Sequence, residues 1–302
     1  MPELPDVELY VSALRERAAG RTLERVRLAA PFLLRSVEPA LSLAEGRIVT
    51  GFRRIGKRIV WELQGELFFV FHLMIAGRFK WRDSGAAVPG RVGLAAFDFA
   101  HGSLLLTESS SRKRASLHVV QGEEALASFD AGGLEVIGSE PAAFAAALQK
   151  ESHTLKRALT DPHLFSGIGN AYSDEILHRA KLSPFKLTRQ LSAGDIAVLH
   201  AATIDTLSEW TARLQRETGG TFPEKVTAFR EGMAAHGRFG KPCPRCSTPV
   251  QRIVHGEHET NYCPSCQTEG RLLADRALSR LLKDDWPRTL DELERRRREN
   301  AG

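Results

Sequence analysis

Four cysteines lie close together near the end of the chain, and they restrict its fold more than any other feature. They form two C-x2-C pairs, Cys243 with Cys246 in "CPRC" and Cys263 with Cys266 in "CPSC", with 16 residues between the pairs. Two such pairs can direct four thiolates at one tetrahedral Zn²⁺. The spacing predicts one structural zinc ion that stiffens a small finger and does no chemistry itself, because four sulfurs fill its coordination sphere.

A redox-active dithiol is the alternative interpretation of the same cysteines. One C-x-x-C pair is enough for that role, and no strand and helix pattern of the thioredoxin type surrounds either pair. His255 and His258 lie between the pairs and are alternative ligands by residue type. Since four sulfurs already complete the set, we expect both histidines on the β-hairpin of the finger.

The charge balance favours an anionic partner, and the apolar segments predict no membrane span. The 302 residues include 42 Lys and Arg against 37 Asp and Glu, which gives a formal charge of +5. The longest apolar run, at 67–77, is about half of the ~20 residues that a membrane helix needs. Glu3, Asp6 and Glu8 stand where a secretory signal is basic and then apolar. We therefore expect a cytoplasmic protein.

The character of the sequence changes near residue 140, which predicts an α+β protein. Before that point a helical stretch at 7–20 precedes short β-rich segments such as "RIVWEL", "ELFFVFHLM" and "GSLLLTES", separated by turn residues. After it, apolar residues recur at helical spacing. We predict a β-sandwich or barrel carrying a helix, then a helical domain, the zinc finger and a helical extension broken at "DDWP", with bounds 1–139, 140–238, 239–270 and 271–302.

Four motifs occur together in one order: the opening "MPELPDVE", "RRIGKR" at 53–58, "FSGIGNAYSDEILHRAKLSP" at 165–184, and the cysteine finger. This combination resembles the formamidopyrimidine-DNA glycosylase and endonuclease VIII family of base-excision repair enzymes, over roughly residues 1 to 270. The resemblance implies an N-terminal β-sandwich and a C-terminal helix-two-turns-helix domain with a zinc finger, which bind damaged DNA in the cleft between them. It implies a bifunctional DNA glycosylase and AP lyase, and we expect a monomer that works in the cytoplasm, at the nucleoid.

The resemblance assigns the chemistry to Pro2, Glu3 and Lys57. A small second residue permits removal of Met1, which leaves Pro2 as a terminal secondary amine. An α-amino group titrates near ~8 and a lysine near ~10.4, so the terminal amine is far more often unprotonated at neutral pH. By resemblance, Pro2 attacks C1′ of a damaged nucleotide and forms a Schiff base, β-elimination or β,δ-elimination nicks the strand, Glu3 acts as acid or base, and Lys57 reaches the same site.

Each of these residues also has a structural interpretation. The opening can be a proline-stiffened arm whose acids, Asp6 and Glu8, favour the start of the first helix. Without the other motifs, Lys57 would be interpreted as a surface lysine in a basic turn. Its register with Pro2 and Glu3 is what favours the catalytic interpretation.

The glycines of "SGIGNAYSDE" allow a tight turn before a helix whose N-terminal amides can receive a phosphate. By resemblance, Asn170 and Lys57 hold phosphates around the lesion, and Lys156 in "TLKRAL" adds a backbone contact. A plain connection between helices is the structural alternative. The same resemblance places His72 of "HLMIAGR" and Arg112 of "SSSRKRASL" among the DNA-binding residues.

Two departures from the family pattern bear on the substrate. Lys113 and Arg114 stand where an aromatic wedge is expected after Arg112, and His258 stands where relatives place a phosphate-binding arginine on the finger. A neutral histidine has one N–H donor, whereas arginine has a charged guanidinium with several donors. Phosphate binding should therefore be weaker or sensitive to pH. We expect a substrate other than paired 8-oxoguanine, such as oxidised pyrimidines, abasic sites or lesions in single-stranded or distorted DNA.

Two further function classes remain open at this point. A non-catalytic or lyase-only protein of the same fold would bind damaged DNA, and only an intact set of Pro2, Glu3 and Lys57 argues against it. A generic zinc-ribbon interaction module would account for the cysteines and leave the N-terminal motif unexplained. A lyase assay on abasic DNA separates a pure binder from a catalyst, since a pure binder does not nick the strand.

Overall fold

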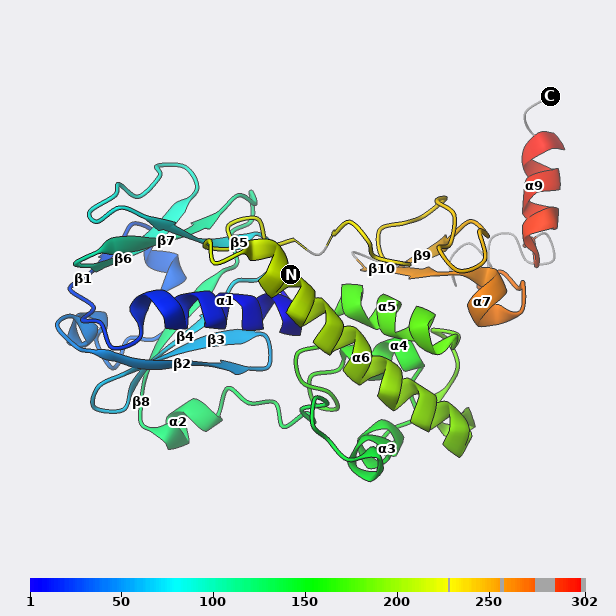
Figure 1. Cartoon of the computed structure of the whole chain (residues 1–302), viewed down its shortest axis with the longest axis horizontal. Coiled ribbons are helices and arrows are strands. Elements are labelled where there is room, and N and C mark those ends of the chain that lie inside the picture. The colour runs from blue at the N-terminus through cyan, green and yellow to red at the C-terminus, as the bar shows by residue number, and fades with distance from the viewer. Residues whose placement is uncertain (228, 256–257, 275–285, 300–302) are drawn as a thin grey trace. The chain divides into compact units, whose positions relative to one another are not determined.

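The computed structural model describes the chain from 1 to 302, except residues 228, 256–257, 275–285 and 300–302. It divides into two compact units (Figure 1). Unit 1 consists of Met1–Gly133 and Ser208–Ala228, and unit 2 of Leu134–Leu207 and Phe229–Gly302. The segment Ser208–Ala228 thus belongs to unit 1, although it follows the helices of unit 2 in the sequence.

Unit 1 contains two four-stranded antiparallel sheets. One has the order β1-β6-β7-β5, formed by β1 (Arg25–Leu28), β6 (Gly93–Phe99), β7 (Gly102–Glu108) and β5 (Gly77–Arg82). The other has the order β2-β3-β4-β8, formed by β2 (Val49–Ile55), β3 (Arg58–Leu63), β4 (Leu67–His72) and β8 (Ser116–Gln121). A short helix, α2 (Glu123–Ala127), follows β8, and 3-10 turns lie at Pro31–Leu33 and Leu41–Ala44.

An aromatic core holds the two sheets of unit 1 together. In β4, Phe69 and Phe71 join this core, whereas Phe68 belongs to a separate cluster on the opposite face, as the two-residue period of a strand requires. Trp61 is fully buried, and its ring lies 5.1 Å from that of Phe97 on the other sheet. Such aromatic pairs contribute about 1 kcal/mol each beyond the free energy of burying their surface, so they help to hold the two sheets together.

The first helix, α1 (Leu4–Ala18), starts three residues before the stretch that the sequence predicted. Pro5 is compatible with the first turn of a helix, where its missing N–H needs no partner. Asp6 Oδ2 accepts a hydrogen bond from the backbone N–H of Glu3 at 3.0 Å, which fixes the helix start. The helix predicted at 7–20 is therefore present, and it already includes Leu4, Pro5 and Asp6 of the opening motif.

Unit 2 is mainly helical and carries the finger. Its helices are α3 (Pro141–Gln149), α4 (Leu155–Thr160), α5 (Asn170–Ala180), the first part of α6 (Ala193–Thr218), α7 (Pro264–Thr268) and α9 (Leu290–Glu299), with a 3-10 turn at Thr188–Gln190. Strands β9 (Gln251–His255) and β10 (His258–Tyr262) form an antiparallel hairpin. Of the two helices predicted after residue 271, the second is α9 and the first falls largely outside the described residues. The sheets, helices and cysteine finger confirm the α+β prediction.

The segment after α6 packs on unit 1. Val226 is part of the sandwich core, and the ring of Phe222 lies 6.1 Å from that of Tyr10 in α1. Glu224 forms a bidentate ion pair with Arg82 of β5, in which Arg82 Nη2 donates to Glu224 Oε2 at 2.9 Å. Within the described residues, no helix is both long and apolar enough to cross a bilayer.

Candidate active site, phosphate-binding helix and zinc centre

The start of the chain lies in a charged environment within unit 1. Pro2 is buried, and Glu3 is 3% exposed. Burial lowers the pKa of the amino group of Met1; Glu3 opposes this shift, while Arg78 and Lys57 add to it. Two carboxylates, Glu3 and Asp6, and two cations thus act on the amino terminus, and burial is the largest cause that favours an unprotonated amine.

Lys57 lies in the two-residue turn between β2 and β3, where Ile55 pairs with Arg58. Gly56 adopts a φ of 58°, the left-handed conformation that such a turn needs and that glycine takes without strain. The charge of Lys57 acts both on the amino terminus and on His72. The charges of Glu3 and Lys57, which are distant in sequence, therefore both act on the amino terminus.

His72 ends β4, and its Nδ1 lies 2.6 Å from Met74 Sδ. Burial, with the charges of Arg58 and Lys57, lowers the pKa of His72 to about 4. The imidazole is consequently neutral at pH 7, so any contact with DNA would be a neutral hydrogen bond and not an ion pair.

The loop that carries Arg112 is fixed by a carboxylate that sequence reasoning missed. Glu108, at the end of β7, is 1% exposed and accepts hydrogen bonds from the backbone N–H of Arg114 at 2.9 Å and of Ala115 at 3.1 Å. Lys113 Nζ donates to the carbonyl of Arg91 at 2.5 Å, whereas Arg112 is exposed. The only sequence signal was an acid directly before a basic loop, which does not reveal the contact.

In unit 2, Asn170 begins α5, directly after Gly169. Its Nδ2 donates to the backbone carbonyl of Glu259 in β10 at 2.8 Å, so the helix start is tied to the finger hairpin. Lys156 of α4 donates to the carbonyl of Asn170 at 2.7 Å and pairs with Asp174. Two of its three ammonium protons are thereby used, which leaves one for a phosphate.

Asp174 and Glu175 are buried carboxylates of α5 that the sequence did not single out. Asp174 Oδ2 accepts from His236 Nδ1 at 2.8 Å and from Asn261 Nδ2 at 3.4 Å. Glu175 accepts from three successive backbone amides, those of Ala234, Ala235 and His236, at 2.7 to 2.9 Å. Burial raises the pKa of Glu175, although these amides oppose the shift. The hydrogen bonds to Asp174 and Glu175 attach residues 234–236, which precede the finger, to α5.

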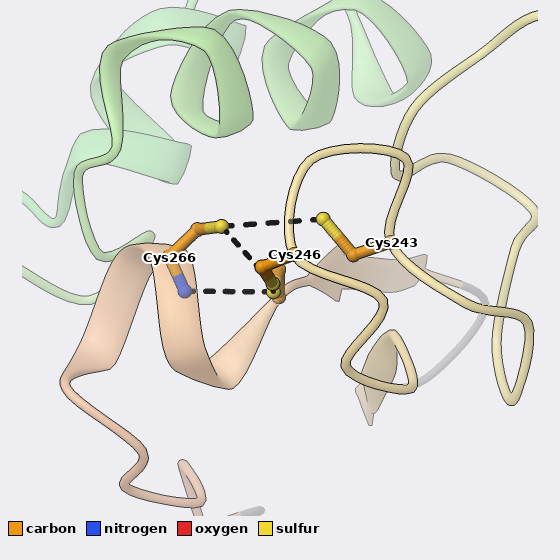
Figure 2. A group of neighbouring side chains, drawn as sticks. Cys243, Cys246 and Cys266 are labelled. Carbon is orange, nitrogen blue, oxygen red and sulfur yellow. Dashed lines mark hydrogen bonds between the residues drawn. The ribbon is translucent and has the colours of Figure 1, made fainter.

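The four cysteines converge as the sequence predicted. Figure 2 shows three of them, Cys243, Cys246 and Cys266. Their sulfurs all lie within 4.8 Å of one another. Cys266 Sγ lies 4.0 Å from Cys243 Sγ and 3.4 Å from Cys246 Sγ, and Cys246 Sγ lies 3.4 Å from Cys263 Sγ. A tetrahedral zinc with bonds of about 2.3 Å places its sulfurs about 3.8 Å apart. The four side chains fit one structural Zn²⁺. Backbone pairing places His258 at the start of β10, but its side chain lies outside the described part of the structure.

Three stretches of the chain match family models. Residues 1–117 match the formamidopyrimidine-DNA glycosylase N-terminal domain, 138–219 the H2TH domain of the same enzymes, and 240–268 the zinc finger found in FPG and IleRS. The formamidopyrimidine-DNA glycosylase of Thermus thermophilus is 32% identical over 287 residues, which cover 89% of this chain and 100% of the relative. An uncharacterised formamidopyrimidine-DNA glycosylase-like protein of Mycobacterium tuberculosis is 43% identical over 129 residues, 43% of this chain and 80% of that protein.

Solved structures are similar over the same length. A complex between a Lactococcus lactis FPG mutant and DNA containing Fapy-dG has a TM-score of 0.79 at 26% identity, covering 88% of this chain and 100% of that one. Lactococcus lactis Fpg bound non-covalently to DNA with an AP site has a TM-score of 0.77 at 25% identity, covering 88% and 99%.

Proposed function

Because the chain belongs to the formamidopyrimidine-DNA glycosylase family, we propose that it is a base-excision repair enzyme that removes damaged bases and then nicks the DNA at the abasic site. The observation that carries the proposal is the cluster at the start of unit 1. Pro2 and Glu3 are buried there, and Lys57 is close enough to act on the amino terminus.

The nucleophile of the proposed reaction is the amine of Pro2 after removal of Met1. Burial and the nearby cations lower the pKa of the terminal amine of Met1, and we expect the same surroundings to act on Pro2. A lowered pKa increases the unprotonated fraction at neutral pH. The nitrogen lone pair then attacks C1′, the bond from C1′ to the base breaks, and the base leaves with the electron pair and takes up a proton.

Strand cleavage follows from the iminium that Pro2 forms with the opened sugar. Opening the ring transfers an electron pair to the ring oxygen, and Glu3 is the group we assign to protonate it. The iminium makes the C2′ proton acidic. Its loss expels the 3′ phosphate in β-elimination, and a second proton loss can expel the 5′ phosphate in δ-elimination. Lys57 is assigned to the adjacent phosphate.

The DNA contacts are proposed from the same family membership. The complexes of the similar structures contain Fapy-dG or an AP site, and we propose that this chain also binds damaged DNA. Asn170 at the start of α5 and Lys156 beside it are the proposed phosphate contacts. Arg112, His72 and His258 are the proposed contacts near the lesion. We propose a monomer that acts at the nucleoid, where its substrate lies.

The substrate is proposed to lie outside paired 8-oxoguanine. Lys113 and Arg114 follow Arg112 in place of an aromatic wedge, and Lys113 is turned to the carbonyl of Arg91. A loop of this kind cannot stack in the space that an extruded base leaves. A panel of lesions tests this point, because strong selectivity for 8-oxoguanine opposite cytosine in duplex DNA contradicts it.

Borohydride trapping tests the mechanism. Reduction of the iminium on abasic DNA should give a stable covalent adduct, and peptide mass mapping should place it on Pro2. A chain with Met1 retained behind an N-terminal extension is the control, since its Pro2 nitrogen is an amide and should give no adduct. An adduct at another residue contradicts the mechanism. Binding of abasic DNA without nicking would favour the non-catalytic alternative.

A further inference from the structure

His178, in the last turn of α5, touches a zinc ligand from outside the finger. Its side chain is buried, at 3% exposed, and its Nε2 lies 3.2 Å from Cys243 Sγ. The two residues are 65 positions apart in the sequence. No motif in the sequence connects them, and the contact is separate from every residue assigned to DNA or catalysis above.

The chemistry of the contact determines which atom carries the proton. A zinc-bound cysteine is a thiolate and has no proton to donate. The proton between the two atoms must therefore sit on His178 Nε2, and the imidazole is the donor. Hydrogen bonds to metal ligands orient them and tune the affinity for the metal.

Other contacts show that α5 and the finger are joined along the whole helix. Near its C-terminal end, Arg245 Nη1 donates to the carbonyl of His178 at 3.2 Å, and Gln267 Nε2 donates to the carbonyl of Leu182 at 2.9 Å. At its start, Asn170 donates to the carbonyl of Glu259. These bonds end on backbone atoms, whereas the bond from His178 ends on a ligand sulfur. His178 is therefore placed to couple the metal itself to the helix.

We propose that His178 is a positioning residue for the zinc site, which donates its Nε2–H to the Cys243 thiolate, tightens zinc binding and makes the stability of α5 depend on the bound metal. The proposal does not depend on the proposed enzymatic function. It concerns unit 2 alone and holds for a catalyst and for a binding protein alike.

Zinc competition against a chromogenic chelator tests the proposal on the full chain. His178→Leu keeps an apolar side chain of similar reach and removes the donor, so zinc affinity should fall about 10- to 100-fold. His178→Gln restores an N–H donor and should recover most of this loss. His200→Leu is the matched control, because His200 is also buried in unit 2, at 7% exposed, and its Nε2 lies 3.2 Å from Ser139 Oγ. It should lower stability without changing zinc affinity.

Two spectroscopic measurements separate this role from a general loss of packing. With Co²⁺ in place of zinc, the sulfur-to-metal charge-transfer bands should shift in His178→Leu and stay unchanged in His200→Leu, because only the first variant alters a ligand thiolate. In the unaltered zinc protein, a long-range ¹H–¹⁵N spectrum of the histidine rings should show a proton on His178 Nε2. The second measurement needs no variant to fold.

The proposal is overturned if His178 Nε2 carries no proton in the zinc-bound protein. A folded His178→Leu chain with the zinc affinity and cobalt spectrum of the parent overturns it as well. Equal losses of zinc affinity in His178→Leu and His200→Leu also overturn it, since packing would then explain the effect. A loss confined to His178→Leu, with recovery in His178→Gln, supports it.

Discussion

Arg54 of β2 donates from Nε to Glu8 Oε1 of α1 at 2.9 Å, and this ion pair joins the first helix to the hairpin that carries Lys57. Arg54 also donates from Nη1 to the carbonyl of Gly56 at 2.8 Å, inside the turn itself. The side chain of Arg54 is 9% exposed. One buried guanidinium thus links the helix that follows Pro2 to the turn that holds Lys57.

Replacing Glu8 by Ala should loosen this link. Since the guanidinium of Arg54 is largely buried, loss of the carboxylate should lower the free energy of unfolding by about 1–2 kcal/mol. The substitution should also slow nicking of abasic DNA about tenfold, because the turn that carries Lys57 is then held less firmly. Urea unfolding and a single-turnover nicking assay measure the two effects. Glu16→Ala, an exposed change on the same helix, is the control. Equal behaviour of the two variants contradicts the role given to the pair.

Replacing Glu108 by Ala should release the loop with Arg112, Lys113 and Arg114. Two backbone N–H groups lose their acceptor, one of them on buried Ala115, which costs about 1–3 kcal/mol. Trypsin cuts after Lys and Arg, so cleavage in this loop should become much faster, and mass spectrometry reads the cut sites.

The control for that experiment is Glu45→Ala. Glu45 also accepts a backbone hydrogen bond in unit 1, from Val26 at 2.8 Å. Cleavage at 112–114 should stay as slow in this variant as in the parent. If Glu108→Ala is cut there no faster than Glu45→Ala, the carboxylate does not hold the loop.

His72 should make unit 1 less stable as the pH falls below neutral. Its pKa is lowered to about 4 in the folded chain, against about 6.5 for an unfolded histidine, so between these values the unfolded chain binds the extra proton. Stability is complete above pH ~6.5 and decreases toward pH ~4 by at most about 1.4 kcal/mol per pH unit.

Urea unfolding at pH 7 and pH 5 measures this effect. His72→Gln cannot take up the proton, so its free energy of unfolding should change less between the two pH values than that of the parent, by up to about 2 kcal/mol. An NMR titration of His72 in the folded parent checks the pKa directly. A midpoint near 6.5 contradicts the lowered value.

Removal of zinc should affect unit 2 and leave the sandwich intact. The finger has a small buried cluster built around its cysteines, whereas unit 1 has its own aromatic core. Structural zinc supplies folding free energy outright. After chelation, hydrogen exchange should become faster in β9, β10 and α5 and stay slow in β6 and β7. Equal acceleration in β6 and β7 would show that the sandwich depends on the metal.

The sequence alone determined the features that depend on neighbours in the chain. The cysteine spacing predicted the zinc site, because each C-x2-C pair forms its own turn and needs only one partner pair. Short segments rich in β-branched and aromatic residues, separated by turn residues, predicted strands such as β3 and β4. The four motifs also indicated the family that the comparisons confirm.

The tertiary structure alone decided which distant groups meet. Asp6 moved the start of α1 to Leu4, Glu108 fixed the loop of Arg112, and the segment at 219–227 packed on unit 1. The contact of His178 with Cys243 spans 65 positions. Periodicity and spacing report interactions within a few residues, whereas burial of a carboxylate or an imidazole depends on how whole elements pack. The residue types were visible in the sequence, but their partners were not.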